Sequence, residues 1–214
     1  MRSLVLLSGG MDSAVCLYRA LAECGAREVE VVFFDWGQRS LSLELAAARA
    51  LCRHAGVDEP VLIEIVFPWG GALTEPGARL PSGRTPSEIA DSGTADTFFP
   101  GRNLVMLAHA FGLAASRGAG RIYFGPNADD AAGYPDCRRE CLDPLADACR
   151  LGTETEVELA LPLIELSKRQ VVEAGDDLGV PWEKTFSCYA PVDGRHCGTC
   201  DSCVLRDSAI SRRD

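Results

Sequence analysis

The sequence predicts an α/β protein with a doubly wound, mostly parallel sheet, and three observations predict this fold. Short apolar runs alternate with helix-like stretches from residue 2 to residue 66. A glycine-rich turn follows the first apolar run, and polar segments follow later ones. Strand, helix, strand in sequence implies a parallel sheet covered by helices, and such sheets bind ligands beyond the carboxyl ends of their strands.

Each element is predicted from the spacing of its apolar residues. We expect strands at 2–7, 29–35, 61–66 and 121–124, with another extended stretch at 157–163. Helices are expected at 11–23, 40–54, 103–117 and near 138–150, from a cap at Ser167 to Leu178, and at the C-terminus. Residues 67–101 hold five prolines and six glycines and predict a long loop, which is usually functional or disordered. Residues 125–138 predict a second loop.

Length and composition limit the kinds of protein to consider. A chain of 214 residues suits one domain with a small appendage, and we expect a boundary between residues 1–180 and a C-terminal segment at 181–214. No apolar run approaches the roughly 18–20 residues of a membrane span, and the N-terminus resembles a first strand more than a signal peptide. We therefore expect a cytoplasmic protein with no membrane partner. The net charge of −10 argues against an extended nucleic-acid surface but not against small anions.

The turn Ser8-Gly9-Gly10-Met11-Asp12-Ser13 predicts an anion site. Glycines and short polar residues let several N–H groups point at one anion, and a following helix adds its positive dipole end. Asp12 would repel a phosphate, but Mg²⁺ between Asp12 and the phosphates removes that objection. The simpler alternative is a tight strand-to-helix turn.

Four cysteines near the C-terminus predict a metal site. Two overlapping C-x-x-C steps and one cysteine upstream supply four thiolates, which suit tetrahedral Zn²⁺; an iron–sulfur cluster is the alternative. A closed four-thiolate site has no open position, so the zinc would be structural. His196 is adjacent to a ligand, which makes joint ligation awkward. The four ligands are Cys188, Cys197, Cys200 and Cys203.

The other cysteines fall in different contexts. Cys137 lies in a polar segment and is a candidate pocket residue. The remaining five are expected to pack as small apolar side chains: Cys16, Cys24, Cys52, Cys141 and Cys149.

The motifs together resemble a known family. The SGGMDS turn is similar to the signature of the PP-loop ATP pyrophosphatases, which implies cleavage of ATP between its α- and β-phosphates. With GQR at 37–39, PGRN at 100–103, GYPDCR at 133–138 and HCGTCDSCVLR at 196–206, the chain resembles the 7-cyano-7-deazaguanine synthase (QueC) family over residues 3–206. Of these motifs, GYPDCR and the cysteine pattern are the most specific.

The resemblance implies roles for particular residues. Catalytic roles fall to Asp12, Lys168 and Arg102, with Lys168 where the family has a phosphate-contacting lysine; its alternative is an exposed position in a first helical turn. ATP is expected at Leu7, Ser8, Gly9, Gly10, Met11, Asp12, Ser13, Gln38 and Arg39. The substrate is expected at Arg102, Asn103, Asp130, Tyr134, Asp136, Cys137 and Arg138.

The resemblance also implies a reaction. An ATP-dependent ligase would convert 7-carboxy-7-deazaguanine and ammonia to the nitrile 7-cyano-7-deazaguanine through two adenylated intermediates, using ATP, Mg²⁺ and structural Zn²⁺. It also suggests a homodimer and no nucleic-acid partner. Other hypotheses are a relative that stops at the amide or joins the acyl group to another amine, another PP-loop enzyme such as a tRNA thiolase, and a zinc-stabilised nucleotide sensor.

Three positions depart from the family pattern. Trp36 precedes GQR where members often have tyrosine, Ser40 follows it where they often have histidine, and Ala132 precedes GYPDC where they usually have serine. Loss of a polar contact to a buried partner can change specificity, so these positions bear on whether the product is nitrile, amide or a conjugate.

Overall fold

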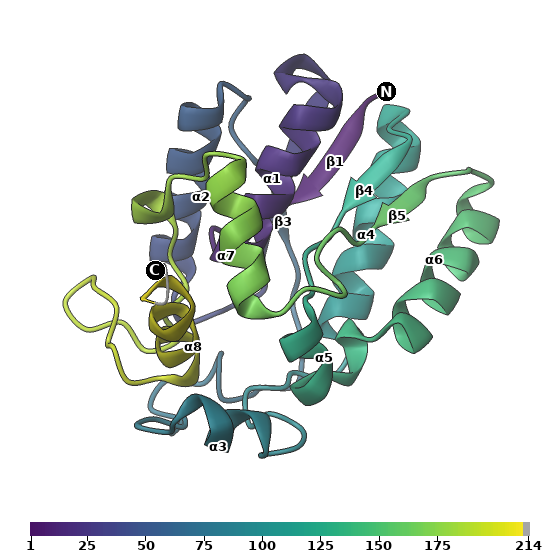
Figure 1. Ribbon diagram of the computed structural model, residues 1–214. Helices are drawn as coiled ribbons and strands as arrows, with labels where there is room; N and C mark the ends of the chain where they lie inside the picture. The colour runs from purple at the N-terminus through teal and green to yellow at the C-terminus, as the bar shows by residue number, and fades with distance from the viewer. Residues whose placement is uncertain (212–214) are drawn as a thin grey trace.

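The computed structural model describes residues 1–211 and consists of one sheet with helices packed against both of its faces (Figure 1). All neighbouring strands are parallel, and their order in space is β3-β2-β1-β4-β5. The strands are β1 (Ser3–Leu6), β2 (Val29–Asp35), β3 (Val61–Glu64), β4 (Arg121–Tyr123) and β5 (Glu158–Ala160).

The order of the strands creates a crevice beside β1. The chain runs outward from β1 to β2 and β3, and then returns to the other side of β1 to add β4 and β5. Ser3 of β1 is in register with Val29 on one side and with Arg121 on the other. Because the winding reverses between β1 and β4, their carboxyl ends form the switch point at which open α/β sheets bind ligands. The glycine-rich turn that follows β1 lies there.

Helices connect the strands, and three short 3₁₀ helices occupy Ala26–Glu28, Pro135–Cys137 and Trp182–Lys184. Among the described residues, no helix combines the length and hydropathy needed to cross a bilayer. The helices are α1 (Met11–Cys24), α2 (Leu41–Ala55), α3 (Pro86–Ala90), α4 (Arg102–Arg117), α5 (Ala128–Gly133), α6 (Arg139–Thr153), α7 (Lys168–Asp177) and α8 (Asp201–Ile210).

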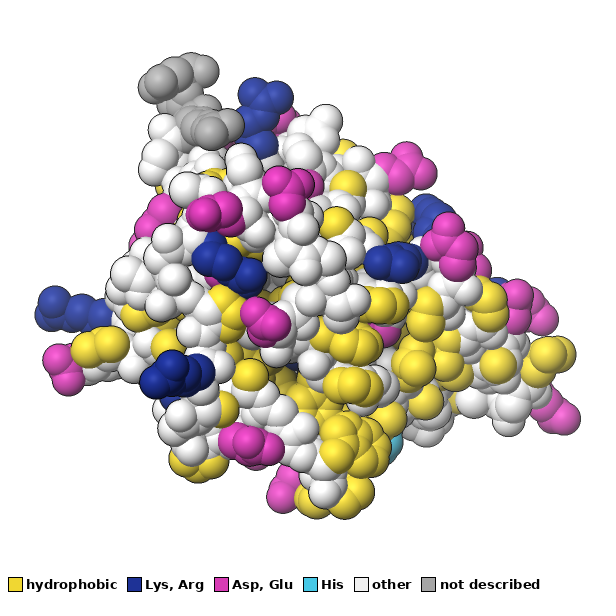
Figure 2. All heavy atoms as spheres, turned by 90° about the horizontal axis from the view of Figure 1, so that it is seen from below, with side chains coloured by type: hydrophobic (Ala, Val, Ile, Leu, Met, Phe, Trp, Pro, Cys, Tyr) yellow, Lys and Arg dark blue, Asp and Glu magenta, His cyan; other side chains and the backbone are white. Residues whose placement is uncertain are grey.

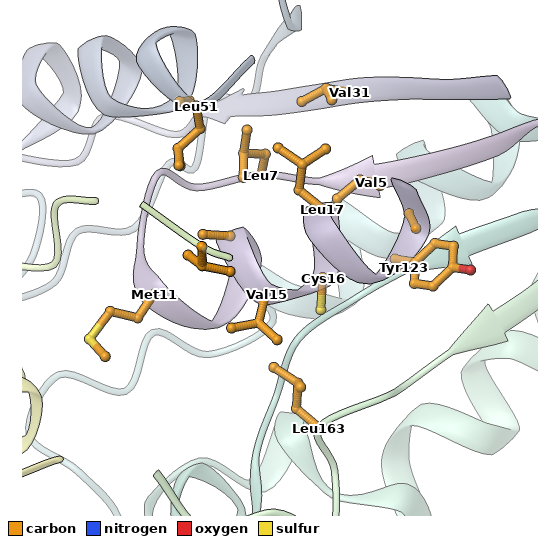
Figure 3. Packing of buried hydrophobic residues seen from close by; sticks show 14 of the residues in the cluster. Val5, Leu7, Met11, Val15, Cys16, Leu17, Val31, Leu51, Tyr123 and Leu163 are labelled. Carbon is orange, nitrogen blue, oxygen red and sulfur yellow. The ribbon is translucent and has the colours of Figure 1, made fainter. Parts of the chain in front are cut away.

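Alternation along β1 builds two cores. Leu4 and Leu6 point to the face covered by α4 and α6. Val5 points to the opposite face, and Leu7, just after the strand, continues toward α1, α2 and α7 (Figure 3). Burying each such side chain contributes about 1.5–3 kcal/mol to folding. The central strand is therefore apolar on both faces, as a parallel sheet covered on both sides requires.

A third, smaller cluster attaches the C-terminal segment to the sheet. Buried cysteines of this segment pack with Phe186 and with Ala47 of α2. Trp182 and Ala209 also belong to the core that contains α1. The boundary at residue 180 remains a prediction, and residues 212–214 of the predicted segment lie outside the described residues.

Most predicted elements are confirmed, with differences at their ends. The strand expected at 61–66 ends at Glu64, and the stretch expected at 157–163 contains only the three-residue β5. The predicted cap of α7 is confirmed, because the Ser167 hydroxyl accepts from the Gln170 N–H and the Gln170 side chain reaches back to the cap.

The prediction of an uninterrupted loop at 125–138 was wrong. Asn127 Oδ1 accepts from the N–H groups of Asp129 at 2.9 Å and Asp130 at 3.0 Å, which starts α5. The long 67–101 loop likewise contains α3, which is capped by Thr85. Helices of five or six residues are too short to leave a periodic apolar pattern, so only their capping residues could have indicated them.

Two mid-helix glycines offer a test of the packing. A Cβ on Gly175 of α7 would lie 2.4 Å from ring carbons of Trp182, whereas a Cβ on exposed Gly112 of α4 would meet nothing within 4 Å. We expect Gly175→Ala to lower the free energy of unfolding by about 1–3 kcal/mol through overpacking. Gly112→Ala should raise it by about 0.5–1 kcal/mol through helix propensity. Urea unfolding followed by circular dichroism measures both, and equal effects would contradict the packing described for α7.

Candidate active site

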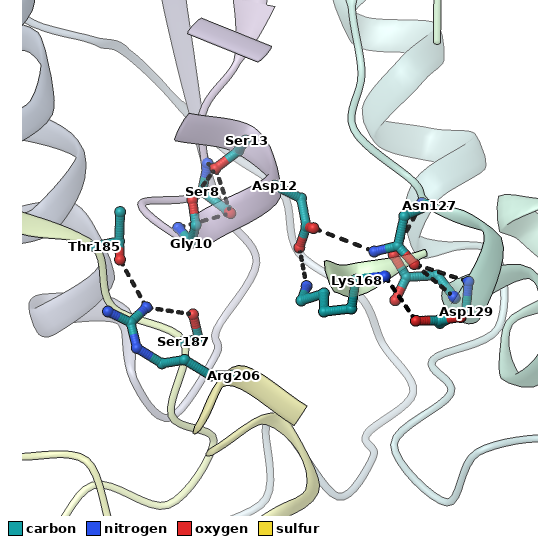
Figure 4. A network of polar contacts seen from close by, with 11 residues as sticks. Ser8, Gly10, Asp12, Ser13, Asn127, Asp129, Lys168, Thr185, Ser187 and Arg206 are labelled. Atoms are coloured by element: carbon teal, nitrogen blue, oxygen red, sulfur yellow. Dashed lines mark hydrogen bonds and ion pairs between the residues drawn. The ribbon is translucent and has the colours of Figure 1, made fainter. Parts of the chain in front are cut away.

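The turn after β1 leads directly into α1. Gly9 has a φ of +83°, and a Cβ there would lie 2.5 Å from the Glu44 carbonyl oxygen of α2, so this position requires glycine. Ser13 Oγ donates to the Gly10 carbonyl at 3.0 Å and accepts from the Ser8 N–H at 3.2 Å, which holds the turn closed (Figure 4). The first N–H groups of α1 have no acceptor within the helix, so the turn can receive an anion.

Asp12, in the first turn of α1, connects three helix starts. Its Oδ2 accepts from Lys168 Nζ at 2.5 Å, and its Oδ1 accepts from Asn127 Nδ2 at 3.2 Å (Figure 4). Lys168 is the first residue of α7 and Asn127 caps α5. The Lys168 backbone N–H also donates to Asp129 Oδ2 at 2.8 Å. The structure therefore brings Asp12 and Lys168, from opposite ends of the chain, into one ion pair beside the turn.

The charges in this network shift the pKa values of two groups. Burial disfavours the ammonium of Lys168, but the carboxylates of Asp12 and Asp130 outweigh it and raise its pKa. Burial raises the pKa of Asp130 to about 6, although Lys168 acts in the opposite direction. Lys168 is thus a fixed positive charge at neutral pH, whereas Asp130 takes up a proton under mildly acidic conditions.

A cavity of about 260 Å³ opens at the carboxyl ends of β1, β2 and β4. Its lining residues lie far apart in the sequence. Their motifs follow different strands of the parallel sheet, so the sequence predicts that they meet at one edge of it. Ten of the predicted site residues line it: Leu7, Ser8, Asp12, Ser13, Gln38, Arg102, Asn103, Asp130, Tyr134 and Cys137.

The cavity has an apolar wall on the β2 side. Phe33, Phe34 and Met106 line it, together with Trp36. The Arg102 guanidinium carbon lies 4.9 Å from the centroid of the Trp36 ring, within cation–π range. An apolar wall with an aromatic face suits a flat, uncharged base.

Glu44 of α2 is a cavity residue that the sequence analysis missed. The Ser40 hydroxyl donates to its Oε1 at 2.6 Å, and Gln38 Nε2 donates to its Oε2 at 3.2 Å and to the Phe34 carbonyl at 3.0 Å. Burial raises the pKa of Glu44. Ser40, one of the positions that depart from the family pattern, therefore holds a carboxyl at the cavity wall.

Cys137 lines the cavity from the 3₁₀ helix that follows α5. Asn103 Nδ2 donates to its sulfur at 3.5 Å. Burial, reinforced by the charges of Asp130 and Asp136, raises the pKa of the Cys137 thiol well above its usual value. A neutral thiol at pH 7 is a weak nucleophile, so this environment favours a packing and hydrogen-bonding role.

Several predicted residues do not line the cavity. Arg39 donates to the Ala78 carbonyl at 3.0 Å in the long loop, and Arg138 donates to the Ala131 carbonyl at 2.7 Å. Asp136 is buried, and within residues 1–211 its Oδ2 has no hydrogen-bond partner. Gly9, Gly10 and Met11 are also absent from the cavity lining, since their part of the turn faces α2 and the C-terminal segment. Lys168 is absent from the lining as well, although its partner Asp12 belongs to it.

Tyr189, from the C-terminal segment, is a second cavity residue that the sequence analysis missed. Tyr134 lines the same cavity, and its hydroxyl lies 2.5 Å from Thr97 Oγ1 of the long loop. Three separate segments therefore meet at this wall of the cavity.

The four predicted metal ligands converge in the C-terminal segment. The sulfur atoms of Cys188, Cys197, Cys200 and Cys203 all lie within 4.8 Å of one another, and two of the separations are 3.9 and 4.0 Å. Four thiolates around Zn²⁺ at about 2.3 Å are about 3.8 Å apart, so the cluster fits a tetrahedral site. The N–H of Cys197 donates to Cys188 Sγ at 3.3 Å.

The C-terminal segment, which contains the four cysteines, is hydrogen-bonded to the turn after β1. The Phe186 N–H donates to the Gly9 carbonyl at 2.8 Å. Arg206 of α8 donates to Thr185 Oγ1 at 2.7 Å and to Ser187 Oγ at 3.5 Å (Figure 4). The cysteine cluster and the anion-binding turn are therefore neighbours in space.

On the face seen in Figure 2, no large area carries charge of only one sign. Acidic and basic side chains lie interspersed around an area where hydrophobic side chains gather. With a net charge of −10, long-range steering by this chain would favour cations, so an anionic ligand must be held by local donors such as Lys168 and Arg102.

Some missed residues had a sequence signal and others had none. Asn127 precedes two acidic residues in NADD, the pattern of a capped helix start. Glu44 is an acidic residue near the start of an Ala- and Leu-rich helix, a common position for an exposed charge. Tyr189 directly follows a ligand cysteine, and nothing in that position indicates that its side chain reaches a cavity.

Comparisons with known proteins agree with this arrangement. A family model described as "Queuosine biosynthesis protein QueC" matches residues 2–213. The 7-cyano-7-deazaguanine synthase of Nostoc punctiforme is 38% identical over 99% of this chain and 95% of its own length. The corresponding synthase of Trichodesmium erythraeum is 40% identical over 98% of this chain and 96% of its own.

A solved structure shares the fold. The U34-tRNA thiolase NcsA from Methanococcus maripaludis, with its [4Fe-4S] cluster, matches 99% of this chain and 71% of that one, with a TM-score of 0.51 and 16% sequence identity. At that identity the likeness concerns the fold alone. With the family match across the described sheet, the cavity and the cysteine cluster, the chain belongs to the QueC family of queuosine biosynthesis proteins.

Proposed function

We propose that this protein is a 7-cyano-7-deazaguanine synthase, an ATP-dependent ligase that converts 7-carboxy-7-deazaguanine and ammonia into the nitrile. The observation that carries this proposal is the resemblance to enzymes of that name, at 38–40% identity across nearly the whole chain. The cavity supports it, because it places an anion-binding turn beside one apolar wall and one polar wall.

The proposed chemistry needs two activations by ATP. The carboxylate of the substrate attacks the α-phosphate, which releases pyrophosphate and forms an acyl-adenylate. Ammonia displaces AMP and leaves an amide. The amide oxygen then attacks a second ATP, and loss of AMP and a proton yields the nitrile. These steps call for positioning and charge stabilisation more than for a protein nucleophile.

In this proposal the turn at residues 8–13 receives the leaving pyrophosphate. The first N–H groups of α1 donate to it, and Lys168 supplies a positive charge that the network of carboxylates maintains at neutral pH. Asp12 would hold Mg²⁺, since its carboxylate retains acceptor sites beyond those used by Lys168 and Asn127. Magnesium would supply further neutralisation of phosphate charge.

The adenine of ATP and the deazaguanine would occupy different walls. The aromatic and apolar side chains on the β2 side suit the uncharged adenine. Asp130, Tyr134 and Arg102 also line the cavity, and they suit the exocyclic amine and the carboxylate of the substrate. The four cysteines would hold structural Zn²⁺.

The alternative product, an amide or a conjugate, was suggested by Ala132 in place of serine. Ala132 is exposed and absent from the cavity lining, and its carbonyl accepts from Arg138. A hydroxyl at that position would face solvent, which supports formation of the nitrile. Trp36, by contrast, lines the cavity, where its ring can contact the substrate.

The proposal includes a homodimer in the cytoplasm. Strand β3 lies at one edge of the sheet. Leu62 of this strand and the nearby Val66 and Trp69 are exposed apolar side chains. Such an edge favours association with another chain. Among the described residues all ten cysteines are free, which suits a reducing compartment.

The test of the activity uses the purified protein with Mg-ATP, ammonia and 7-carboxy-7-deazaguanine, with products followed by mass spectrometry. We expect the nitrile together with AMP and pyrophosphate. Amide as the only product would move the assignment to the variant relative, and absence of turnover would remove the assigned substrate.

A substitution in α7 tests the role of Lys168. We expect Lys168→Ala to lower kcat by about a hundredfold or more, because a preorganised positive charge is lost from the phosphate site. Arg169→Ala is the matched control, since Arg169 is the next residue of the same helix and its side chain is 63% exposed. If both variants keep wild-type rates while remaining folded, Lys168 has no part in catalysis.

The metal proposal is tested by replacing one ligand. Metal analysis of the wild-type protein should give about one zinc per chain, and Cys200→Ser should lose zinc and melt at a lower temperature because a tetrahedral site loses a thiolate. Cys141→Ser, which changes a thiol of α6 outside the cluster, should retain zinc. Soluble, folded wild-type protein without zinc would argue against the assignment, and iron in its place would favour the cluster alternative.

A further inference from the structure

Asn127 is a fully buried residue that is hydrogen-bonded to two acidic residues of the site. Its side-chain Nδ2 donates to Asp12 Oδ1 at 3.2 Å (Figure 4). Its backbone N–H donates to Asp130 Oδ2, also at 3.2 Å. Both aspartates line the cavity, whereas Asn127 does not. Asn127 therefore connects an acidic residue of α1 with one of α5 from outside the cavity lining.

The two ends of the Asn127 amide have different partners. Its Oδ1 accepts from the N–H groups of Asp129 and Asp130 at 2.9 and 3.0 Å, which caps α5. A cap of this kind needs only an oxygen, and serine or aspartate supplies one as well as asparagine does. The bond from Nδ2 to Asp12 is therefore a contribution of asparagine beyond the cap itself.

The carboxylate of Asp12 is held at both of its oxygens. Asn127 Nδ2 donates to Oδ1, and Lys168 Nζ donates to Oδ2. With a bond at one oxygen only, the carboxylate could turn about its Cβ–Cγ bond, whereas bonds at both oxygens fix its plane. The lone pairs that remain on Asp12 then have set directions, as a group that acts at a reacting phosphate requires.

We propose that Asn127 is a positioning residue that fixes the plane of the Asp12 carboxylate and its place relative to Asp130. The inference rests on the proposed function and deepens it. In that function Asp12 acts at the phosphates of ATP and Asp130 at the acceptor substrate, so the connection between them aligns the two reactants. Misalignment of reacting groups lowers the rate of the chemical step more than it lowers affinity.

The charges around the Asn127 side chain explain why a neutral amide suits this position. Four ionisable residues lie around it, directly bonded or one contact away: Asp12 of α1, Lys168 of α7, and Asp129 and Asp130 of α5. An aspartate here would put a carboxylate where the amide nitrogen now lies 3.2 Å from Asp12. Two carboxylates so close share a proton, which raises the apparent pKa of the pair.

The experiment compares Asn127→Asp with the wild-type protein in steady-state turnover at about pH 8.5 and about pH 6. The variant keeps the capping oxygen and loses the donor to Asp12. At the higher pH we expect kcat to fall about thirtyfold, with the KM values for ATP and the acceptor within about threefold. At the lower pH the deficit in kcat should shrink to about threefold or less, because the shared proton restores a donor to Asp12.

Ala128→Asp is the matched control. It adds the same charge at the next residue of α5, whose side chain is exposed, and it should keep the wild-type kcat at both pH values. A second measurement needs no ligand. In a carbon-13 NMR titration of the aspartate carboxyls, Asn127→Asp should show an additional carboxyl whose pKa lies above the usual aspartate range, because of the neighbouring Asp12 charge. Ala128→Asp should show its additional carboxyl at an ordinary pKa.

Each outcome decides the inference. A kcat deficit that shrinks at the lower pH, together with the raised carboxyl pKa, supports it. An unchanged kcat, an equal deficit at both pH values, or an ordinary pKa for the new carboxyl overturns it and leaves the proposed function intact. No turnover by the wild-type protein overturns both. If Asn127→Asp does not fold, Asn127→Ser, which also keeps a capping oxygen, should lose kcat equally at both pH values, and wild-type kcat in that variant overturns the inference.

Discussion

Three helices begin at one point of this molecule, and the ion pair between Asp12 and Lys168 holds them there. Asp12 lies in the first turn of α1, Asn127 caps α5 and Lys168 opens α7. Each helix start carries a partial positive charge, and Lys168 adds a full one, so the point would be unstable without carboxylates. Asp12 and Asp129 supply them through direct contacts. The same excess of positive dipole ends is what the proposed pyrophosphate site would use.

The C-terminal segment connects two other parts of the molecule, the turn after β1 and the long loop. On one side it holds the turn after β1 through the bond from the Phe186 N–H to the Gly9 carbonyl. On its other side the segment contacts the long loop. Arg84 of the loop forms a bidentate ion pair with Asp201, and the Gly83 N–H donates to the Thr199 carbonyl at 2.8 Å. Asp201 directly follows Cys200 of the cysteine cluster, so the cluster and the long loop are linked through these contacts.

The parts that could be predicted from the sequence are those governed by local spacing. The two faces of β1, the cap at Ser167 and the convergence of the four cysteines all follow from patterns within about twenty residues. Short helices such as α5 leave no such pattern, and neither do contacts made by folding distant segments together. Glu44 and Tyr189 reach the cavity through such contacts between distant segments. The sequence around Glu44 is already explained by helix formation, and the sequence around Tyr189 by the predicted metal ligands. The positions of Asp12, Lys168 and Arg102 at or beside the cavity are compatible with their predicted roles, whereas Arg39, Asp136 and Arg138 lie outside the cavity lining.

The order of synthesis along the chain determines which parts of this structure can form first. Chains emerge from the ribosome N-terminus first, and sheet segments can fold as they appear. All five strands precede residue 161, so a nascent chain can assemble the sheet early, whereas the core on the α1 side still lacks α7, Trp182 and Ala209 at that point. Tyr189 and the four cysteines come within the last part of the chain. A growing polypeptide would therefore complete the cavity wall that Tyr189 lines, and bring the four cysteines together, only after most of the chain has emerged.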